Sequence, residues 1–179
     1  MSTLRVGDLV VLAAEDGSLL SAEPLRRRAA VRPPSSSWPH VGGACVFELC
    51  LAHASPESAE VWSRELVRLR HTRSGQLLCA SPNTPTTAEA DDCLAVSVLP
   101  EGELRGAAAV ATSCWEVGRA SGGHGGIALQ AGEQLLLRGA ACGLYLRASD
   151  GEASRGGAAQ RWTLNRYAAA APALSLIHI

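Results

Sequence analysis

The chain has 179 residues, a formal net charge of −1 and 4% aromatic residues. This length suits a single domain, and the near-neutral charge argues against nucleic acid as a partner. No apolar run reaches the roughly 20 residues of a membrane-spanning helix, and none follows the first residues as in a signal peptide. We therefore expect a cytosolic domain without direct membrane contact, in which the six cysteines are reduced.

The first predicted structural unit covers residues 4–50. The short apolar run from Leu9 to Leu12 is typical of a buried strand, and Gly17 marks the turn into a second strand. A basic run from Arg26 to Arg28 follows, which we interpret as a solvated turn. The unit closes on Phe47, which begins a short alternating run of apolar and polar residues.

A short helix is predicted after the first unit, over residues 55–63. Ser55 is expected to be its N-cap, and Pro56 its first helical residue. Glu57 supplies the acidic residue that is favoured in a first turn. Trp62 is expected to pack this helix against the rest of the domain.

The second unit covers residues 65–118 and the third covers residues 127–166. Both repeat the order of the first unit: a strand, a turn with glycine, a second strand and a closing aromatic residue. Internal similarity of this kind indicates a repeat architecture, and about a dozen short strands indicate a closed all-β fold. We predict a β-trefoil over residues 1–167, with three units of four strands and the short helix between units one and two.

Three large aromatic residues close the three units: Phe47, Trp115 and Trp162. Aromatic side chains bury the most area per residue, so a chain with few of them depends on those it has. We expect all three to be buried at equivalent positions of the core.

No residue pattern indicates a catalytic, ligand-binding or metal site. The sequence has no nucleophile elbow, phosphate loop or paired-histidine motif. His71 is interpreted as a surface residue near a turn, because a lone histidine lacks the orienting partner that catalysis needs. A cluster of Cys45, Cys50 and His53 is conceivable, but the Cys-x-x-Cys pairs of zinc sites are absent. We expect no enzymatic activity, no cofactor and no bound metal.

The last residues, 168–179, are expected to be a disordered, non-native tail. Pro172 interrupts an alanine-rich run that has no amphipathic pattern. The closing residues 174–179 read Leu-Ser-Leu-Ile-His-Ile, which resembles the translation of an adaptor used in sequencing libraries. We expect the tail to pack against nothing, and the chain to be a fragment of a larger protein.

Several short motifs, in order along residues 4–167, resemble the N-terminal domain of the inositol trisphosphate receptor and ryanodine receptor family. Those similar to inositol trisphosphate receptors are Gly7-Asp8, Leu12, Ala14-Glu15, Gly17, Leu20-Ser21, Val31-Arg32-Pro33, Cys45-Val46-Phe47-Glu48-Leu49-Cys50, Ala59 and Trp62. Those similar to ryanodine receptors are Val67-Arg68-Leu69-Arg70-His71-Thr72-Arg73-Ser74 and Leu78-Cys79. Those similar to both are Cys114-Trp115, Gly132-Glu133 and Tyr145-Leu146-Arg147-Ala148-Ser149.

This resemblance implies the N-terminal regulatory β-trefoil of an intracellular ligand-gated calcium-release channel, on the cytosolic face of the endoplasmic reticulum. The implied partners are the downstream domains and the neighbouring subunits of a homotetramer. In that family the basic residues that bind inositol phosphates lie beyond the corresponding domain. No ligand-binding residue therefore carries over to this chain.

A carbohydrate-binding β-trefoil of the MIR or ricin type is the alternative, because sugar-binding trefoils share the architecture and fold alone does not fix function. Gln160-Arg161-Trp162 matches the Gln-x-Trp of ricin-type lectins. Phe47 and Trp115 lack a glutamine two residues before them. The sequence leaves both alternatives open.

Overall fold

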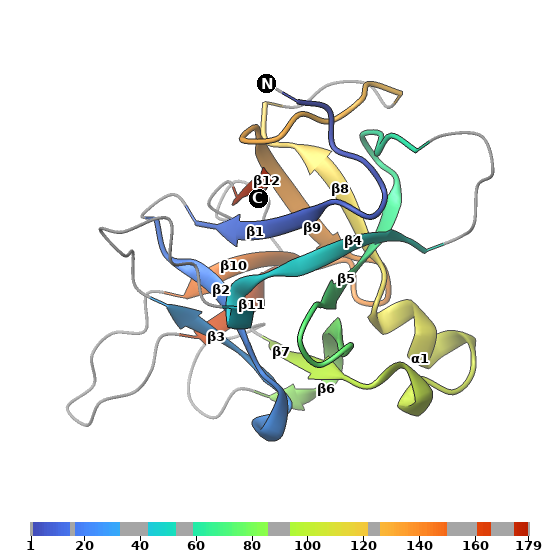
Figure 1. Ribbon diagram of the computed structural model, residues 1–179. Coiled ribbons are helices and arrows are strands. Elements are labelled where there is room, and N and C mark those ends of the chain that lie inside the picture. Colours follow the sequence, from blue (N-terminus) through green and yellow to red (C-terminus); the bar gives the residue numbers. More distant parts are fainter. Residues whose placement is uncertain are drawn as a thin grey trace.

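The computed structural model describes residues 2–14, 17–32, 43–52, 59–85, 94–121, 126–149, 161–165 and 174–178. These residues form twelve strands (Figure 1): β1 (Leu9–Ala13), β2 (Leu19–Glu23), β3 (Arg28–Arg32), β4 (Phe47–Leu51), β5 (Leu66–His71), β6 (Leu77–Pro85), β7 (Leu94–Leu99), β8 (Trp115–Arg119), β9 (Gln134–Gly139), β10 (Tyr145–Ser149), β11 (Arg161–Asn165) and β12 (Leu174–His178). The helical elements are short: η1 (Pro24–Arg26), η3 (Gly43–Cys45), η4 (Glu101–Glu103) and α1 (Ala107–Thr112). The prediction of an all-β chain is confirmed.

Six of the strands close into a barrel. Strand β1 pairs with β4, β4 with β5, β5 with β8, β8 with β9, β9 with β12, and β12 with β1, all antiparallel. Closure removes the free edges that an open sheet would expose. Along β5 and β8 the buried and less buried residues alternate, so every second side chain points into the barrel.

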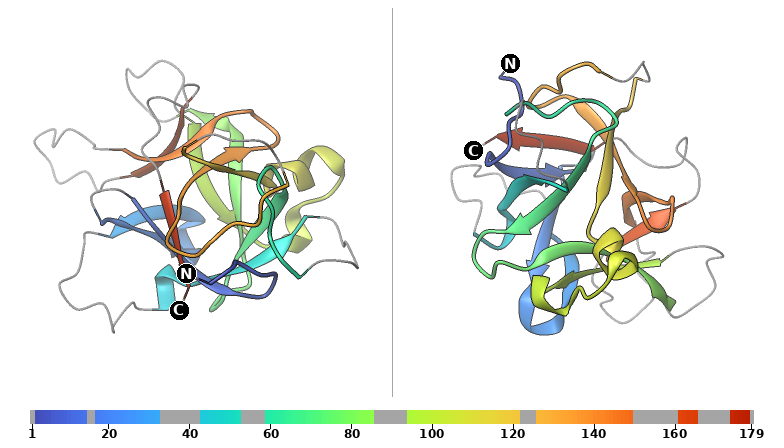
Figure 2. Two further views of the ribbon diagram at one scale, coloured as in Figure 1. Left: turned by 90° about the horizontal axis from the view of Figure 1, so that it is seen from above. Right: turned by 90° about the vertical axis from the view of Figure 1, so that its right-hand side faces the viewer.

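The remaining strands form three hairpins toward one end of the barrel, the lower part of Figure 1. They are β2 with β3, β6 with β7, and β10 with β11. Strand β7 also pairs with β3 and with β11, so the hairpins are joined to one another. The two further views in Figure 2 show this layer beside the barrel strands.

The same turn precedes β1, β5 and β9, at residues 5–8, 62–65 and 130–133. In each turn the first backbone N–H donates to the carboxylate of the fourth residue: Arg5 to Asp8 at 2.8 Å, Trp62 to Glu65 at 2.8 Å, and Gln130 to Glu133 at 3.2 Å. In each turn the third residue has a left-handed backbone: Gly7 with φ 90°, Arg64 with φ 71° and Gly132 with φ 80°.

A cycle of three backbone hydrogen bonds joins the segments that lead into these turns. Leu4 N–H donates to the Leu129 carbonyl at 2.8 Å, Leu129 N–H to Val61 at 2.9 Å, and Val61 N–H to Leu4 at 2.9 Å. All three side chains are buried in the main core. The cycle therefore brings together three segments that are far apart in sequence.

This cycle corrects the prediction of a helix over residues 55–63. Residues 59–63 are not helical: Glu60 forms an isolated bridge with Arg5, and Trp62 forms one with Ala128. Residues 55–58 lie outside the described part of the chain. The backbone groups of this segment bond to distant partners rather than to each other, so long-range pairing outweighs the local helix signal. In the described residues the α-helix is α1, between β7 and β8.

The predicted core aromatics agree with the structure where they are described. Phe47 and Trp115 are both fully buried in the main core. Trp115 Nε1 donates to the Leu78 carbonyl at 2.9 Å, which satisfies the only polar group of that side chain. Trp162 lies in β11, opposite Ala148 of β10, and its side chain is outside the described residues.

The expected surface position of His71 is wrong. Its side chain is buried, with 2% of its surface exposed, and its ring lies 5.6 Å from that of Phe47. Nδ1 lies 2.8 Å from Ser74 Oγ, and Nε2 lies 3.0 Å from the Gly43 carbonyl. Because a carbonyl only accepts, Nε2 is the donor. His71 therefore ties the β5 turn to η3 inside the core.

The expectation that residues 168–179 pack against nothing is also corrected. Residues Leu174–His178 form β12, which pairs with β1 over four residues and with β9 over two. The alternating sequence of this segment suits a strand, and the edges of β1 and β9 provide backbone partners on both sides. Residues 168–173 and 179 lie outside the described part of the chain.

Candidate functional site

The tip of the β2–β3 hairpin, residues 23–28, presents an exposed apolar side chain. Leu25 lies in η1 and has a relative exposure of 102%, the largest among the exposed apolar residues described. Pro24 fixes the first helical position, and the left-handed Arg27, with φ 52°, ends the turn by donating its N–H to the Pro24 carbonyl at 3.2 Å. The backbone therefore holds Leu25 outward in a defined conformation.

Ion pairs surround this hairpin tip. Glu23 lies 2.6 Å from Arg28 and 3.8 Å from Arg26, and Arg27 lies 2.8 Å from Glu103 in η4. The hydrogen bond from Arg28 lowers the pKa of the Glu23 carboxyl below its ordinary value. Arg26 and Arg27 keep more than half of their side-chain surface exposed, consistent with the solvated turn predicted for this basic run.

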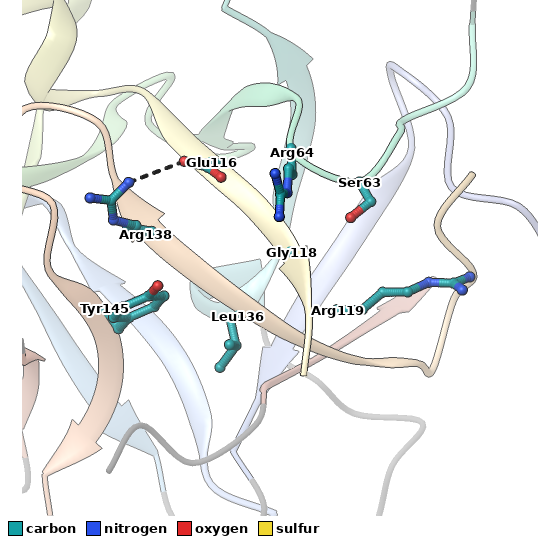
Figure 3. A pocket seen from close by; sticks show the side chains of 8 residues that line it. All are labelled: Ser63, Arg64, Glu116, Gly118, Arg119, Leu136, Arg138 and Tyr145. Carbon is teal, nitrogen blue, oxygen red and sulfur yellow. Dashed lines mark hydrogen bonds and ion pairs between the residues drawn. The ribbon is translucent and has the colours of Figure 1, made fainter. Parts of the chain in front are cut away.

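A second feature is a hollow on the outer face of the barrel, with a volume of about 180 Å³ (Figure 3). We call it the arginine hollow. Its lining residues come from the turn before β5, from β8, from β9 and from β10: Ser63, Arg64, Glu116, Gly118, Arg119, Leu136, Arg138 and Tyr145. Glu116 and Gly118 on β8, and Leu136 and Arg138 on β9, alternate with the buried residues of these strands, so the barrel itself fixes their outward direction.

Two of the three arginines of the hollow have partners. Arg138 Nη1 lies 3.4 Å from Glu116 Oε2, across the β8–β9 pair, and its Nε donates to the Gly143 carbonyl at 3.1 Å. Arg119 Nε lies 2.7 Å from Glu133 Oε1, and its guanidinium turns away from the centre of the hollow in Figure 3. Arg64 makes no ion pair with any residue in the described part of the chain.

The structure describes two members of the conceivable metal cluster of Cys45, Cys50 and His53. Within the described ranges, no three side chains of His, Cys, Asp or Glu are placed to hold a metal ion. Cys45 is buried and Cys50 half-buried, while His53 lies outside the described residues. Burial raises the pKa of the Cys79 thiol to about 11, which removes the thiolate that reactive cysteines use.

In the part of the chain that the structure describes, no helix is both long enough and apolar enough to cross a membrane.

Sequence reasoning missed both surface features, although one signal for each was present. The three turns at 5–8, 62–65 and 130–133 align, and the second has Arg64 where the others have Gly7 and Gly132. An arginine in a position that favours glycine is a local exception, and such exceptions often mark functional sites. The exposure of Leu25 has no such signal, because it depends on how the hairpin projects from the barrel.

Comparison with solved structures finds similar folds over almost the whole chain. A Caenorhabditis elegans protein with unknown function aligns with a TM-score of 0.76 and 15% identity, covering 98% of this chain and 96% of that one. The SDF2-like protein from Arabidopsis thaliana aligns with a TM-score of 0.74 and 15% identity, covering 98% and 94%. The S. cerevisiae protein O-mannosyltransferase Pmt1-Pmt2 complex aligns with a TM-score of 0.73 and 19% identity, covering 98% of this chain and 25% of that one.

In sequence, no family model matches the chain and no curated protein matches it. The structural likenesses, all below 20% identity, show the fold alone. These structures are consistent with the MIR-like fold named among the expectations from the sequence.

Proposed function

We propose that this chain is a β-trefoil of the MIR type that works as a non-catalytic docking module. Three observations support the trefoil: the closed ring of six strands, the three joined hairpins and the turn that recurs before β1, β5 and β9. A module of this kind acts by presenting surface to other domains rather than by chemistry of its own.

Within that class, we favour the regulatory domain of an intracellular calcium-release channel. The ordered motifs that resemble inositol trisphosphate and ryanodine receptors support this role. It places the module on the cytosolic face of the endoplasmic reticulum, in contact with downstream domains and neighbouring subunits of a homotetramer. The module then modulates gating because it binds those partners better in one channel state than in the other.

The hairpin tip is the observation that carries the docking role. Leu25 stands fully exposed on a turn that ion pairs hold on both sides. Burying a leucine side chain contributes about 1.5–3 kcal/mol. Allosteric couplings typically amount to about 1–3 kcal/mol. One such contact, made in only one channel state, therefore suffices for regulation.

The test uses the full-length protein in isolated membranes. Deleting residues 1–178, which removes all twelve strands, is expected to change ligand affinity and calcium release, and Leu25→Ala is expected to reproduce a substantial part of that change. Ile127→Ala is the matched control, because Ile127 is an exposed apolar residue outside the hairpin tip, with 42% exposure. Unchanged affinity and gating after the deletion would reject the regulatory role. An effect of Ile127→Ala equal to that of Leu25→Ala would reject the hairpin tip as the contact.

A carbohydrate-binding module is the second candidate, and the fold likeness to the yeast O-mannosyltransferase complex favours it. That structure is described as bound to the sugar donor. Tyr145 in the arginine hollow offers an aromatic ring beside polar groups, which is a common arrangement in ligand sites. The test is an array of mannose- and galactose-type glycans. Tight binding that is lost in Tyr145→Ala would favour the carbohydrate-binding function over the channel-domain function.

A further inference from the structure

We propose that the arginine hollow is a binding site for one carboxylate, the side chain of an aspartate or glutamate in an acidic segment of a partner polypeptide. The proposal concerns a different surface from the hairpin tip and does not depend on the channel role. It rests on the backbone of Arg64, the charge balance of the hollow and the space above Gly118.

Arg64 occupies a backbone position that disfavours it. Its φ of 71° is left-handed, and the equivalent turns have Gly7 with φ 90° and Gly132 with φ 80°. Residues other than glycine are strained in this region, and such strain is concentrated at functional sites. The Arg64 N–H is held all the same, because it donates to the Val117 carbonyl at 2.6 Å. The turn therefore keeps its geometry while presenting a guanidinium where its two counterparts present no side chain.

The charges of the hollow leave one positive charge unmatched. Arg138 is paired with Glu116, and Arg119 is paired with Glu133. Arg64 is exposed and makes no ion pair within the described residues. It lines the hollow together with Glu116 and Gly118 of β8 (Figure 3). A ligand with a single negative charge therefore balances the hollow.

The hollow has free space at Gly118, which lines it together with Arg64. Gly118 lies in the interior of β8, opposite Leu136 of β9, and a Cβ at position 118 would meet no atom within 4 Å. Glycine in a strand interior weakens the strand, and it often marks a site where a ligand approaches closely. Leu136 supplies an apolar surface for the methylene groups of an acidic side chain, and Tyr145 lines the hollow from β10.

Both the size and the charge of the hollow favour one acidic side chain. Its volume of about 180 Å³ is below the 300–1,000 Å³ or so that is usual for small-molecule pockets. The planar guanidinium matches the two oxygens of a carboxylate in a bidentate arrangement. A phosphate dianion would bring two charges to a site with one charge to offer.

The experiment is a titration of the ¹⁵N-labelled chain with a synthetic peptide that has several glutamates separated by glycines, followed by NMR. The peptide is expected to shift the backbone signals of Arg64, Gly118 and Arg138. Arg64→Gly is expected to weaken the peptide affinity about ten-fold, since a charge-assisted contact is lost. This variant has the glycine that the other two turns have at the same position, so it is expected to fold.

Two further variants separate the site from general charge effects. Gly118→Val fills the free space without changing any charge, and it is expected to weaken binding as strongly as Arg64→Gly. Arg105→Gly removes an exposed arginine outside the hollow, and it is expected to leave the affinity within about two-fold, because an isolated surface charge contributes little. Circular dichroism of each variant establishes that it is folded.

Three results would overturn the proposal. The first is the absence of shifts at the hollow with millimolar peptide. The second is equal weakening by Arg64→Gly and Arg105→Gly, which would mean non-specific attraction. The third comes from titration with two small anions, inorganic phosphate and acetate. Phosphate binding more tightly than acetate would reject a carboxylate as the preferred ligand. Acetate binding as tightly as the peptide would reject the side chain of a partner polypeptide as the ligand.

Discussion

Removing the hydrogen-bonding edge of Trp115 while keeping an aromatic ring tests how the barrel core is held together. In Trp115→Phe the Leu78 carbonyl loses its indole partner, which lies 2.9 Å away in a fully buried environment. An unsatisfied buried acceptor costs about 1–3 kcal/mol. The void left by the missing part of the ring costs about 1 kcal/mol more. We therefore expect Trp115→Phe to lower the free energy of unfolding by about 3 kcal/mol.

The assay is urea unfolding followed by circular dichroism, with Phe47→Leu as the control. Phe47 is also fully buried in the same core, but its side chain has no polar group. Its replacement by another apolar residue is expected to cost less than about 1.5 kcal/mol. Trp115→Phe should also lower the Tm by roughly 6–12 °C in a domain of this size. If Trp115→Phe costs no more than Phe47→Leu, the buried hydrogen bond does not stabilise the core as argued.

Three further predictions concern other parts of the chain. Arg64→Gly should raise the free energy of unfolding by about 1 kcal/mol, because it relieves a left-handed backbone; a destabilised variant in thermal unfolding would contradict the strain. Deleting residues 174–178 should lower the Tm by about 5 °C or more, since β1 and β9 each lose a strand partner; an unchanged Tm would mean that β12 adds no stability. Burial lowers the pKa of His71 below 6.5, so the unfolded chain binds a proton more readily and stability falls as the pH drops through about 6.5. His71→Gln should flatten the fall in stability between about pH 7 and pH 5, and an equal slope in both proteins would refute this assignment.

The all-β class and two core aromatics were predictable because they depend on composition and local pattern. Short apolar runs bounded by glycine indicate strands, and Phe47 and Trp115 stand out in a chain with few aromatics. Burial of His71 was not predictable in this way. It depends on the Gly43 carbonyl, 28 positions away in sequence, being placed opposite Nε2 by the β4–β5 pairing.

The predicted helix failed for a related reason. Ser55, Pro56 and Glu57 form a good local start signal, but residues 59–63 bond to Leu4, Ile127 and Leu129 instead. Local signals do not reveal that three distant segments meet in one cycle. The arginine hollow has the same origin, since Arg64 and Tyr145 come together only when β5, β8 and β9 are aligned in the barrel and β10 pairs with β9.

The position of β12 has a consequence for how this domain is made. Val10 in β1 pairs with His178 in β12, so the barrel cannot close until residue 178 has left the ribosome. Until then β1 and β9 present bare edges, and such edges invite pairing with other chains. Contacts this distant in sequence also slow folding. The nascent domain is therefore most exposed to aggregation before β12 emerges from the ribosome, and a chaperone that covers the edges of β1 and β9 would be most useful in that interval.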